Sequence, residues 1–367
     1  MRWLRNLVPK PRVNLSANVQ RVTECRRVII FARLPSPTYD YYLAARLSAP
    51  GMPEFLVFDP SRLAEPLPEA RESFVIICRY ASLRTVRWIK QNSHELCGVA
   101  LMIDDDLASV ILSGEASFRY RVKLLWSSVL PTFLLGRHLS VVFASTPYLA
   151  QILGGGAKGI RVLPPAPPAT MFTRDMPSTA APVINHGTPI VVAYHATSIH
   201  VSEHAFLVPV LREILSDRPN VTFEVFGGRQ VERLWRDVPQ VTFRRPMSWM
   251  DYLEEGKSRK IDIMLVPLAP LPINESRSDT KRIDIVRYGA AAILSASTAY
   301  GLEDDSGEII LPLEVDRWKE SILRLIDDEH LRTKTAAATA AKVAAMAKRS
   351  AAGLELLASV AGKNDTC

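Results

Sequence analysis

The chain has 367 residues, and 45 Lys and Arg against 38 Asp and Glu give it a formal net charge of +7. This length suits two domains better than one hydrophobic core, and 48% hydrophobic with 23% charged residues excludes a disordered chain. The charge is uneven, because residues 1–27 hold seven basic residues and one acid, which leaves the other 340 residues almost neutral. We therefore expect a basic N-terminal arm over residues 1–27.

Four cysteines are present and no two of them have CxxC spacing, which favours a reduced, cytoplasmic protein over a disulfide framework or a zinc site. The sequence has no uninterrupted apolar run of 18 residues, so no membrane-spanning helix is expected. The longest candidate, residues 122–135, is interrupted by Lys123, two serines and Pro131.

Residues 28–164 alternate short apolar runs with helical patterns. Apolar runs of four to six residues are typical of strands that are covered on both faces, and their alternation with helices predicts a doubly wound parallel sheet. The expected strands are 28–31, 55–58, 74–78, 98–103 and 141–144, and the expected helices are 38–47, 83–91, 118–135 and 147–153.

A proline-rich stretch, residues 165–189, separates this half from a second one and is expected to be an inter-domain linker. The alternation then resumes over residues 190–328, and an Ala-rich helix is expected over residues 329–367. The expected strands of this half are 190–194, 221–226, 241–243, 261–267, 291–295 and 309–311, and the expected helices are 202–216 with Ser202 as its N-cap, 248–255, 279–288 and 315–326.

The predicted fold class is therefore α/β, with two Rossmann-like domains that face a central cleft. Ligands of such sheets bind at the carboxyl ends of the strands. The pattern alone allows either a cleft enzyme or a two-lobed binding protein.

The segment 261–300 is the most informative part of the sequence. Lys281 and Asp284 are three residues apart and share one helical face. The predicted helix begins near Ser278, so its free N–H groups and the positive end of its dipole form an anion site. Arg277 and the hydroxyls of Ser276, Ser278 and Thr280 would suit a diphosphate. The alternative is that Lys281, Arg282 and Asp284 form a solvated helix face.

This segment resembles the donor-binding region of GT-B glycosyltransferases, of the family 1 and family 4-like group. The family pattern is a strand that ends in P-L, followed by N-x-x-x-S-x-x-K-x-x-E and then by G-x-P-V-V-x-S. The residues of this chain that fall in register with it are Asn274, Ser278, Lys281, Asp284, Gly289 and Ser295, and Tyr300 follows them. The resemblance implies that Asp284 binds the nucleotide ribose and that Lys281 faces the donor phosphates. The chain departs from the family in three places: position 284 is Asp instead of Glu, the usual proline is Ala291, and Ser276 stands where the first Glu is expected, with Glu275 one position away.

The resemblance continues along the rest of the second half. His195 and His200 match a loop position where the family often has a basic residue near the donor, and Gly227 and Gly228 follow the next strand. It implies catalytic roles for Lys281, Glu275 and His200. The alternatives are structural histidines or a metal site, and the spacing of the histidines does not favour a metal.

In the first half, Asp104, Asp105 and Asp106 follow a predicted strand, and Tyr39, Asp40 and Tyr41 lie in the first strand–helix loop, which lines the acceptor site in the family. We expect acceptor-side roles for Tyr39, Asp40, Asp104 and Asp105. The alternative for the three aspartates is a cap on the following helix.

The expected activity is transfer of a sugar from a nucleotide-diphosphate sugar to a glycan or lipid-linked acceptor. It is expected to need neither metal nor cofactor, because a helix N-terminus with Lys281 and Arg277 can stabilise the leaving diphosphate. The resemblance implies a retaining reaction in bacterial surface polysaccharide or lipopolysaccharide biosynthesis. One alternative is a non-catalytic GT-B scaffold protein; another, nucleic-acid binding through the basic arm, is not favoured.

The basic arm also carries Trp3, Leu4, Leu7 and Val8. Basic residues beside apolar ones suit an anionic membrane surface, so the protein is expected in the cytoplasm, with the option of a peripheral position at the inner face of the membrane. The alternative is a solvated, disordered terminus.

Overall fold

The computed structural model describes residues 8–14, 25–113, 116–154, 159–172, 189–196, 200–303 and 306–349. The chain divides into two units. Unit 1 consists of Met1–Pro168, Ser276–Ser278 and Met346–Cys367, and unit 2 of Ala169–Glu275 and Asp279–Ala345. Most of the basic arm, residues 173–188 of the expected linker and residues 350–367 of the expected C-terminal helix lie outside the described residues.

Unit 1 contains a six-stranded parallel sheet in the order β2-β1-β3-β4-β5-β6. Its strands are β1 (Arg27–Ala32), β2 (Glu54–Phe58), β3 (Ser73–Cys78), β4 (Leu96–Ile103), β5 (Val141–Ala144) and β6 (Ile160–Val162). Its helical segments are α1 (Pro37–Tyr39), η2 (Asp40–Ala44), α2 (Ala45–Leu47), α3 (Leu83–Asn92), α4 (Leu107–Leu112), α5 (Phe118–Leu124), η3 (Leu125–Val129), α6 (Leu130–Leu135), η4 (Gly136–His138) and α7 (Pro147–Gly154).

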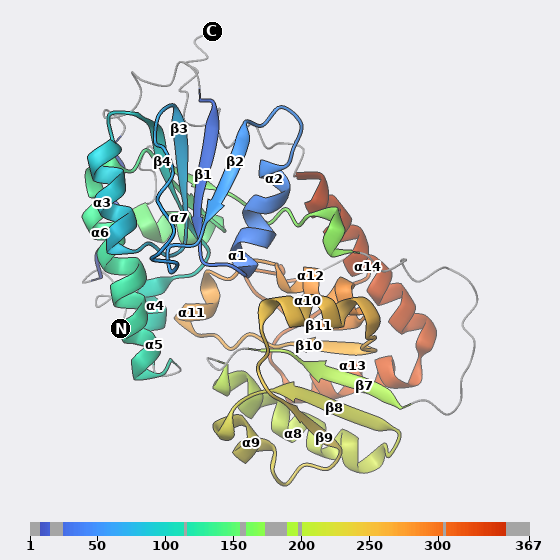
Figure 1. The fold of residues 1–367 in the computed structure, drawn as a ribbon. Coiled ribbons are helices and arrows are strands. Elements are labelled where there is room, and N and C mark those ends of the chain that lie inside the picture. Colours follow the sequence, from blue (N-terminus) through green and yellow to red (C-terminus); the bar gives the residue numbers. More distant parts are fainter. Residues whose placement is uncertain are drawn as a thin grey trace. The chain divides into compact units, whose positions relative to one another are not determined.

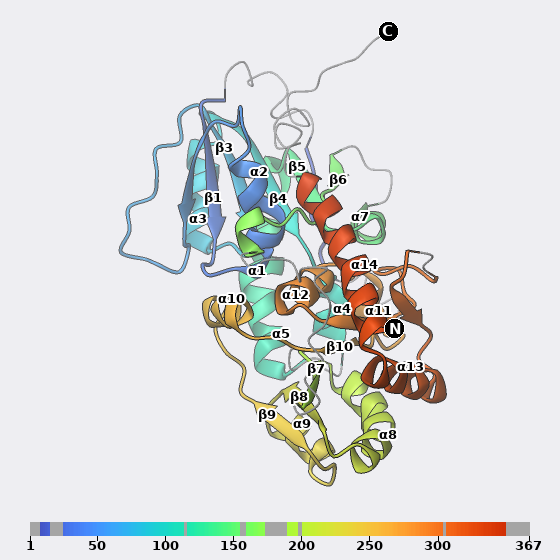
Figure 2. The same ribbon diagram turned by 90° about the vertical axis from the view of Figure 1, so that its right-hand side faces the viewer.

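Every residue of β3 and β4 is buried, because helices cover both faces of this sheet. On one face, side chains of β1, β3, β4 and β5 pack with α3, α6 and α7 in a single apolar cluster that includes Trp88 and Leu149. Figures 1 and 2 show α2 on the side of the sheet away from α3. A strand buried on both faces has no polar residues to alternate, which is why these strands are continuous apolar runs.

Unit 2 contains a second six-stranded parallel sheet, in the order β12-β11-β10-β7-β8-β9. Its strands are β7 (Ile190–Tyr194), β8 (Val221–Phe226), β9 (Val241–Arg244), β10 (Ile263–Val266), β11 (Ala291–Ser295) and β12 (Ile309–Leu311). Its helical segments are η5 (Ala169–Met171), α8 (Val201–Asp217), α9 (Arg229–Trp235), α10 (Trp249–Ser258), α11 (Pro272–Glu275), α12 (Lys281–Tyr288), α13 (Val315–Asp327) and α14 (Glu329–Lys348), whose residues from Met346 on are grouped with unit 1.

Two apolar clusters form the core of unit 2, one on each face of its sheet. Alternate residues of the strands pack against α8, α9 and α13 on one face, around Trp235 and Trp318. The other residues of the same strands pack against α12 and α10 on the opposite face, around Tyr288. The predicted architecture of two doubly wound parallel sheets is confirmed.

Several predicted boundaries were wrong or incomplete. Helix α8 begins at Val201 with His200 as its N-cap, so Ser202 lies inside the helix. Helix α12 begins at Lys281, three residues later than the predicted start near Ser278. The sequence patterns did not indicate β6, α4 or α9, each of which has at most seven residues. No helix among the described residues is long and apolar enough to cross a membrane.

Candidate functional site

The sheet of unit 2 reverses its winding between β7 and β10. Strands β8 and β9 follow on one side of β7, whereas β10, β11 and β12 follow on the other. The connections after β7 and β10 therefore leave the sheet in opposite directions, and the carboxyl ends of these two strands flank the crevice in which such sheets bind ligands. His195 follows β7, and residues 267–280 follow β10 and lead into α12. Most of the predicted donor-side residues belong to these two connections.

A buried carboxylate fixes the connection after β10. Glu203, in the first turn of α8, is fully buried and accepts hydrogen bonds from the backbone N–H of Ala269 at 3.1 Å and from Nδ2 of Asn274 at 2.6 Å. Asn274 Nδ2 also donates to the carbonyl of Ala269 at 2.9 Å, and the N–H of Leu268 donates to the Ser295 hydroxyl at 2.8 Å. The amide nitrogen of Asn274 thus shapes the loop, and its predicted contact with the donor stays a prediction.

The first turn of α12 presents the predicted Lys–Asp pair. Lys281 Nζ lies 3.0 Å from Oδ2 of Asp284, which confirms that the two residues share one helical face. Arg287 Nη1 is 3.5 Å from the other oxygen of Asp284, and Arg287 Nη2 donates to the carbonyls of Tyr252 and Leu253. Asp284 is buried and its two cations hold it in place, whereas Lys281 is 29% exposed. Lys281 is thus the member of the pair that a ligand can reach.

Ion pairs and hydrogen bonds near the first turn of α12 connect this helix to neighbouring elements of unit 2. The buried guanidinium of Arg282 contacts Glu308 at 2.7 Å and donates to the carbonyl of Tyr300 at 3.1 Å, and Lys342 of α14 reaches the same carboxylate at 3.1 Å. Thr280 is the N-cap residue of α12, but its side chain makes no capping hydrogen bond. The Thr298 hydroxyl donates to the carbonyl of Glu275 at 2.8 Å.

His195 is part of a buried polar network. Its Nε2 lies 2.9 Å from Oε1 of Glu224 and its Nδ1 lies 3.1 Å from the hydroxyl of Tyr252. Since a carboxylate only accepts, Nε2 carries the proton and the Tyr252 hydroxyl donates to Nδ1. Glu224 also forms an ion pair with Arg259. Both Arg259 and Arg244 pair with Glu255. Both ring nitrogens of His195 are thus occupied, and its direct contact with the donor stays a prediction.

The pKa values of this network follow from burial and pairing. Burial lowers the pKa of His195, the hydrogen bond to Glu224 opposes this, and the positive charge of Lys281 adds to the lowering. Burial would raise the pKa of Glu224, but its bonds to His195 and Arg259 outweigh burial and lower the pKa to about 2. Near neutral pH the network therefore contains a neutral imidazole beside a carboxylate.

The other predicted histidine, His200, lies where the connection after β7 enters α8. Its Nδ1 is 3.5 Å from Oε1 of Glu203, the carboxylate that also holds the loop after β10. Burial would raise the pKa of Glu203, and its interaction with His200 lowers the pKa below the ordinary value. His200 is thereby linked to the loop that carries Asn274 and Glu275, and its catalytic role stays a prediction.

Gly227 and Gly228 lie between β8 and α9, and they differ in how much space surrounds them. A Cβ atom on Gly227 would lie 2.4 Å from Cβ of Val231, whereas one on Gly228 would meet nothing within 4 Å. Gly227 is thus required by the close approach of Val231 in the first turn of α9. The predicted donor contacts of Gly227 and Gly228 stay predictions.

The predicted acceptor-side residues lie at the carboxyl ends of strands in unit 1. Asp104 follows β4, and its Oδ2 accepts from the hydroxyl of Thr38 at 2.6 Å. Arg79 follows β3 with a left-handed φ of 63° and contacts Asp104 at 3.3 Å and Asp105 at 2.6 Å. Burial raises the pKa of Asp104 despite the charge of Arg79. No sequence pattern indicated Arg79, because its partners Asp104 and Asp105 lie 25 and 26 residues further along the chain.

The remaining residues of this group have separate surroundings. Asp106 caps α4 by accepting from the N–H of Ser109 at 3.2 Å, so the capping alternative holds for this one aspartate. Burial and the neighbouring Asp40 raise the pKa of Tyr39 to about 12. Residues Ser276–Ser278 are grouped with unit 1, where Arg277 Nη1 lies 2.8 Å from Oδ1 of Asp105.

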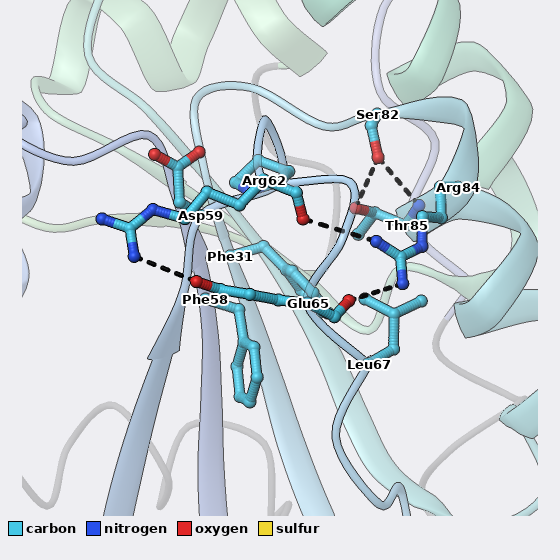
Figure 3. A pocket seen from close by; sticks show the side chains of 10 residues that line it. Phe31, Phe58, Asp59, Arg62, Glu65, Leu67, Ser82, Arg84 and Thr85 are labelled. Atoms are coloured by element: carbon cyan, nitrogen blue, oxygen red, sulfur yellow. Dashed lines mark hydrogen bonds and ion pairs between the residues drawn. The ribbon is translucent and has the colours of Figure 1, made fainter.

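A small pocket lies beside the ends of β1 and β2 in unit 1 (Figure 3). Phe31 and Phe58 line it, and Arg84 donates to the carbonyls of Leu63 at 2.8 Å and Glu65 at 2.6 Å. The guanidinium of Arg84 therefore anchors the loop that follows β2, and none of the predicted site residues lines this pocket.

No family model matches the sequence, and no curated protein matches it significantly. Solved structures do match. HepE from Anabaena in complex with UDP and glucose aligns with a TM-score of 0.56 at 13% identity, over 90% of this chain and 100% of that chain. HepE in complex with UDP-glucose gives a TM-score of 0.55 at 15% identity, over 90% and 99% of the two chains. TarM gives 0.50 at 11% identity, over 81% of this chain and 56% of TarM.

These neighbours are GT-B glycosyltransferases, and their two-domain architecture matches the two parallel sheets described above. This chain has the GT-B fold. At these identities the likeness establishes the fold alone. The GT-B resemblance of the sequence is confirmed at that level, and the individual site residues stay predictions.

The described part of this GT-B chain contains no group of three or more His, Cys, Asp or Glu side chains that could hold a metal ion. The three histidines that cluster in sequence at positions 195, 200 and 204 have separate partners. His195 binds Glu224, His200 approaches Glu203, and His204 accepts a hydrogen bond from Nε1 of Trp235 at 3.1 Å. No sequence pattern indicated Glu203 and Glu224, the two buried carboxylates that hold the connections after β10 and β7.

Proposed function

We propose that this GT-B chain is a glycosyltransferase that moves a sugar from a nucleotide-diphosphate sugar to a glycan or lipid-linked acceptor. The observation that carries the proposal is the position of Lys281. This partly exposed lysine is the first residue of α12, and it directly follows the connection after β10, at the point where the unit 2 sheet reverses its winding. HepE, which shares the fold over 90% of this chain, was solved with UDP-glucose, and UDP-glucose is therefore the first donor to test.

The chemistry asks the protein to stabilise a leaving diphosphate. An ammonium group and the free N–H groups at a helix N-terminus do this when they are already oriented before the reaction. Asp284 holds Lys281 at the first turn of α12, and Arg287 holds Asp284. In our proposal Lys281 binds the donor phosphates and Asp284 the ribose, with Glu275, His200, Arg277, Ser276, Ser278 and Thr280 as further donor-side candidates.

The finer features of the activity are part of the same proposal. Lys281 and the helix N-terminus supply positive charge from the protein itself, which supports a reaction independent of metal. The sequence resemblance supports retention of configuration and a place in bacterial surface polysaccharide or lipopolysaccharide biosynthesis. Tyr39, Asp40, Asp104 and Asp105 are the acceptor-side candidates, and the net charge of the basic arm supports a position at the cytoplasmic face of a membrane.

Calorimetry with UDP-glucose and a panel of other nucleotide sugars tests the donor. A charged hydrogen bond contributes about 1.5–3 kcal/mol, so Lys281→Ala should weaken donor binding by about 10- to 100-fold. The matched control is Lys257→Ala, which removes the lysine of another i,i+3 ion pair in unit 2, with Glu254. An equal loss in both variants, or no binding of any donor by the wild type, would contradict the proposal.

Donor hydrolysis and transfer, followed with a labelled sugar, separate the enzyme from a non-catalytic scaffold protein. Turnover that persists after treatment with a chelator is expected for a metal-independent reaction. A chain that binds the donor and turns over none of it with any acceptor would be the scaffold alternative.

A further inference from the structure

One helical segment of unit 1 carries several large apolar side chains that are exposed among the described residues. Helix α5, η3 and α6 run continuously from Phe118 to Leu135 (Figure 1). Phe118 is 76% exposed, Trp126 60% and Phe133 56%, and Leu125 is exposed as well. Large aromatic side chains of a water-soluble surface are seldom this exposed together, and such a patch marks an interaction site.

The exposed residues share one side of the segment. Leu125 and Trp126 lie seven and eight residues after Phe118, and Phe133 lies seven after Trp126, which is the spacing of one helical face. The opposite side is buried in unit 1 through Leu124, Ser128, Thr132 and Leu135. We call Phe118, Leu125, Trp126 and Phe133 the aromatic face.

Basic side chains accompany the aromatic face in the sequence. Residues 116–140 contain Arg119, Arg121, Lys123 and Arg137 and no acid, and the nearest preceding acid is Glu115. Arg119 and Lys123 are exposed beside the aromatic face. Apolar and aromatic residues flanked by Lys and Arg suit the headgroup region of an anionic bilayer, whereas the centres of protein–protein interfaces are depleted in Lys. Lys123 and Pro131 interrupt the segment, so it suits a position along the surface better than across the bilayer.

We propose that the aromatic face of residues 118–135 docks on an anionic lipid surface, with Phe118, Trp126 and Phe133 in the headgroup region and Arg119 and Lys123 against lipid phosphates. The residues of this surface differ from those of the basic N-terminal arm. It does not depend on the proposed transferase activity, because vesicle binding is measured without donor or acceptor.

The test is co-sedimentation of the full chain with vesicles of phosphatidylcholine, with and without phosphatidylglycerol. The wild type should bind the anionic vesicles more strongly. The variant F118S/W126S/F133S should lower the partition coefficient by about tenfold or more, since the apolar contribution is lost. The variant R119Q/K123Q should lower it by about fivefold for each charge, which corresponds to about 1 kcal/mol per basic residue.

Matched controls keep composition and fold constant. M250S/L302S removes two exposed apolar residues of unit 2, and R87Q/K90Q removes two exposed charges from α3; both should bind vesicles as the wild type does. Circular dichroism of each variant confirms folding, which these exposed positions should not disturb.

Two results would overturn the proposal. The first is no vesicle binding by the wild type, or equal binding by the wild type and F118S/W126S/F133S. Equal binding would mean that the basic arm, which is the same in both proteins, is sufficient for it. The second is a dimer seen by light scattering that F118S/W126S/F133S abolishes while anionic vesicles remain unbound, which would make a second copy of the chain the occupant of the aromatic face.

Discussion

His195 and Glu224 form a buried hydrogen bond of 2.9 Å between Nε2 and Oε1, immediately behind the reversal of the unit 2 sheet. Glu224 lies in β8 beside Ala193 of β7, and His195 is the first residue after β7. The pair thereby fixes the backbone at the point where β7 ends. Since Arg259 holds the other side of the carboxylate, this end of the sheet depends on a side chain in the middle of β8.

Replacing Glu224 by Gln should lower the free energy of unfolding by about 3 kcal/mol, because the buried carboxylate that accepts from His195 and pairs with the partly exposed Arg259 is lost. The pKa of Glu224 is lowered to about 2 from an ordinary value of 4.5, so its stabilising effect is present above pH 4.5 and is lost as the pH falls toward 2. Urea unfolding of both proteins across this range measures the difference, which should shrink with acid. The control Glu254→Gln, at an exposed pair, should change little. A constant difference at all pH values would contradict the assignment.

Acid should destabilise unit 2 through His204. This residue is fully buried and accepts a hydrogen bond from Trp235 Nε1, and burial lowers its pKa from 6.5 to about 4. The unfolded chain therefore binds the proton more tightly, and stability falls as the pH drops from 6.5 to 4, by about 3 kcal/mol. His204→Gln keeps an acceptor for Trp235 and should flatten this part of the stability curve. Parallel curves for the two proteins would show that other groups are responsible.

Asn274→Ala should loosen the connection after β10, because Glu203 and the carbonyl of Ala269 each lose a donor. We expect a loss of about 1–3 kcal/mol in unfolding free energy and faster amide hydrogen exchange over residues 268–275. Asn92→Ala is the control, since the amide of Asn92 donates to a backbone carbonyl, that of Trp88, in α3 of unit 1. Unchanged exchange in the loop of the Asn274 variant would argue against this anchor.

Gly227→Ala should destabilise the protein by about 1–3 kcal/mol, because the added methyl group overlaps Val231. The neighbouring Gly228→Ala has space around its Cβ and should cost less than about 1 kcal/mol, the effect of a weaker N-cap residue for α9. Thermal or urea unfolding compares the two. If both substitutions cost the same, the close approach of Val231 is not what requires a glycine.

The buried strands were the part of the fold that sequence could predict. Val28–Phe31 and Phe74–Cys78 are apolar throughout because helices cover both faces of the sheet. Strand β6 was missed because it has three residues and none of them is buried. Helices α4 and α9 have six and seven residues, too few for a clear period.

The candidate site was predictable where its interactions are local. Lys281 and Asp284 are three residues apart in one helix, and their pairing follows from helical geometry alone. Asn274 and Glu203 are 71 residues apart, and His195 and Glu224 are 29 apart, so neither contact leaves a local pattern. Without those partners, the sequence offered Asn274 only as a donor contact, and it left His195 as either a donor contact or a structural histidine.

The strand orders of the two sheets have a consequence for protein engineering. Among the described residues, β2 alone lies on one side of β1 in unit 1, whereas both β8 and β9 lie on one side of β7 in unit 2. Strands with the same rank in chain order therefore hold different places in the two sheets. Hybrids that exchange such strands between the halves should fail to fold, whereas an exchange of a whole unit with another GT-B protein preserves each set of connections.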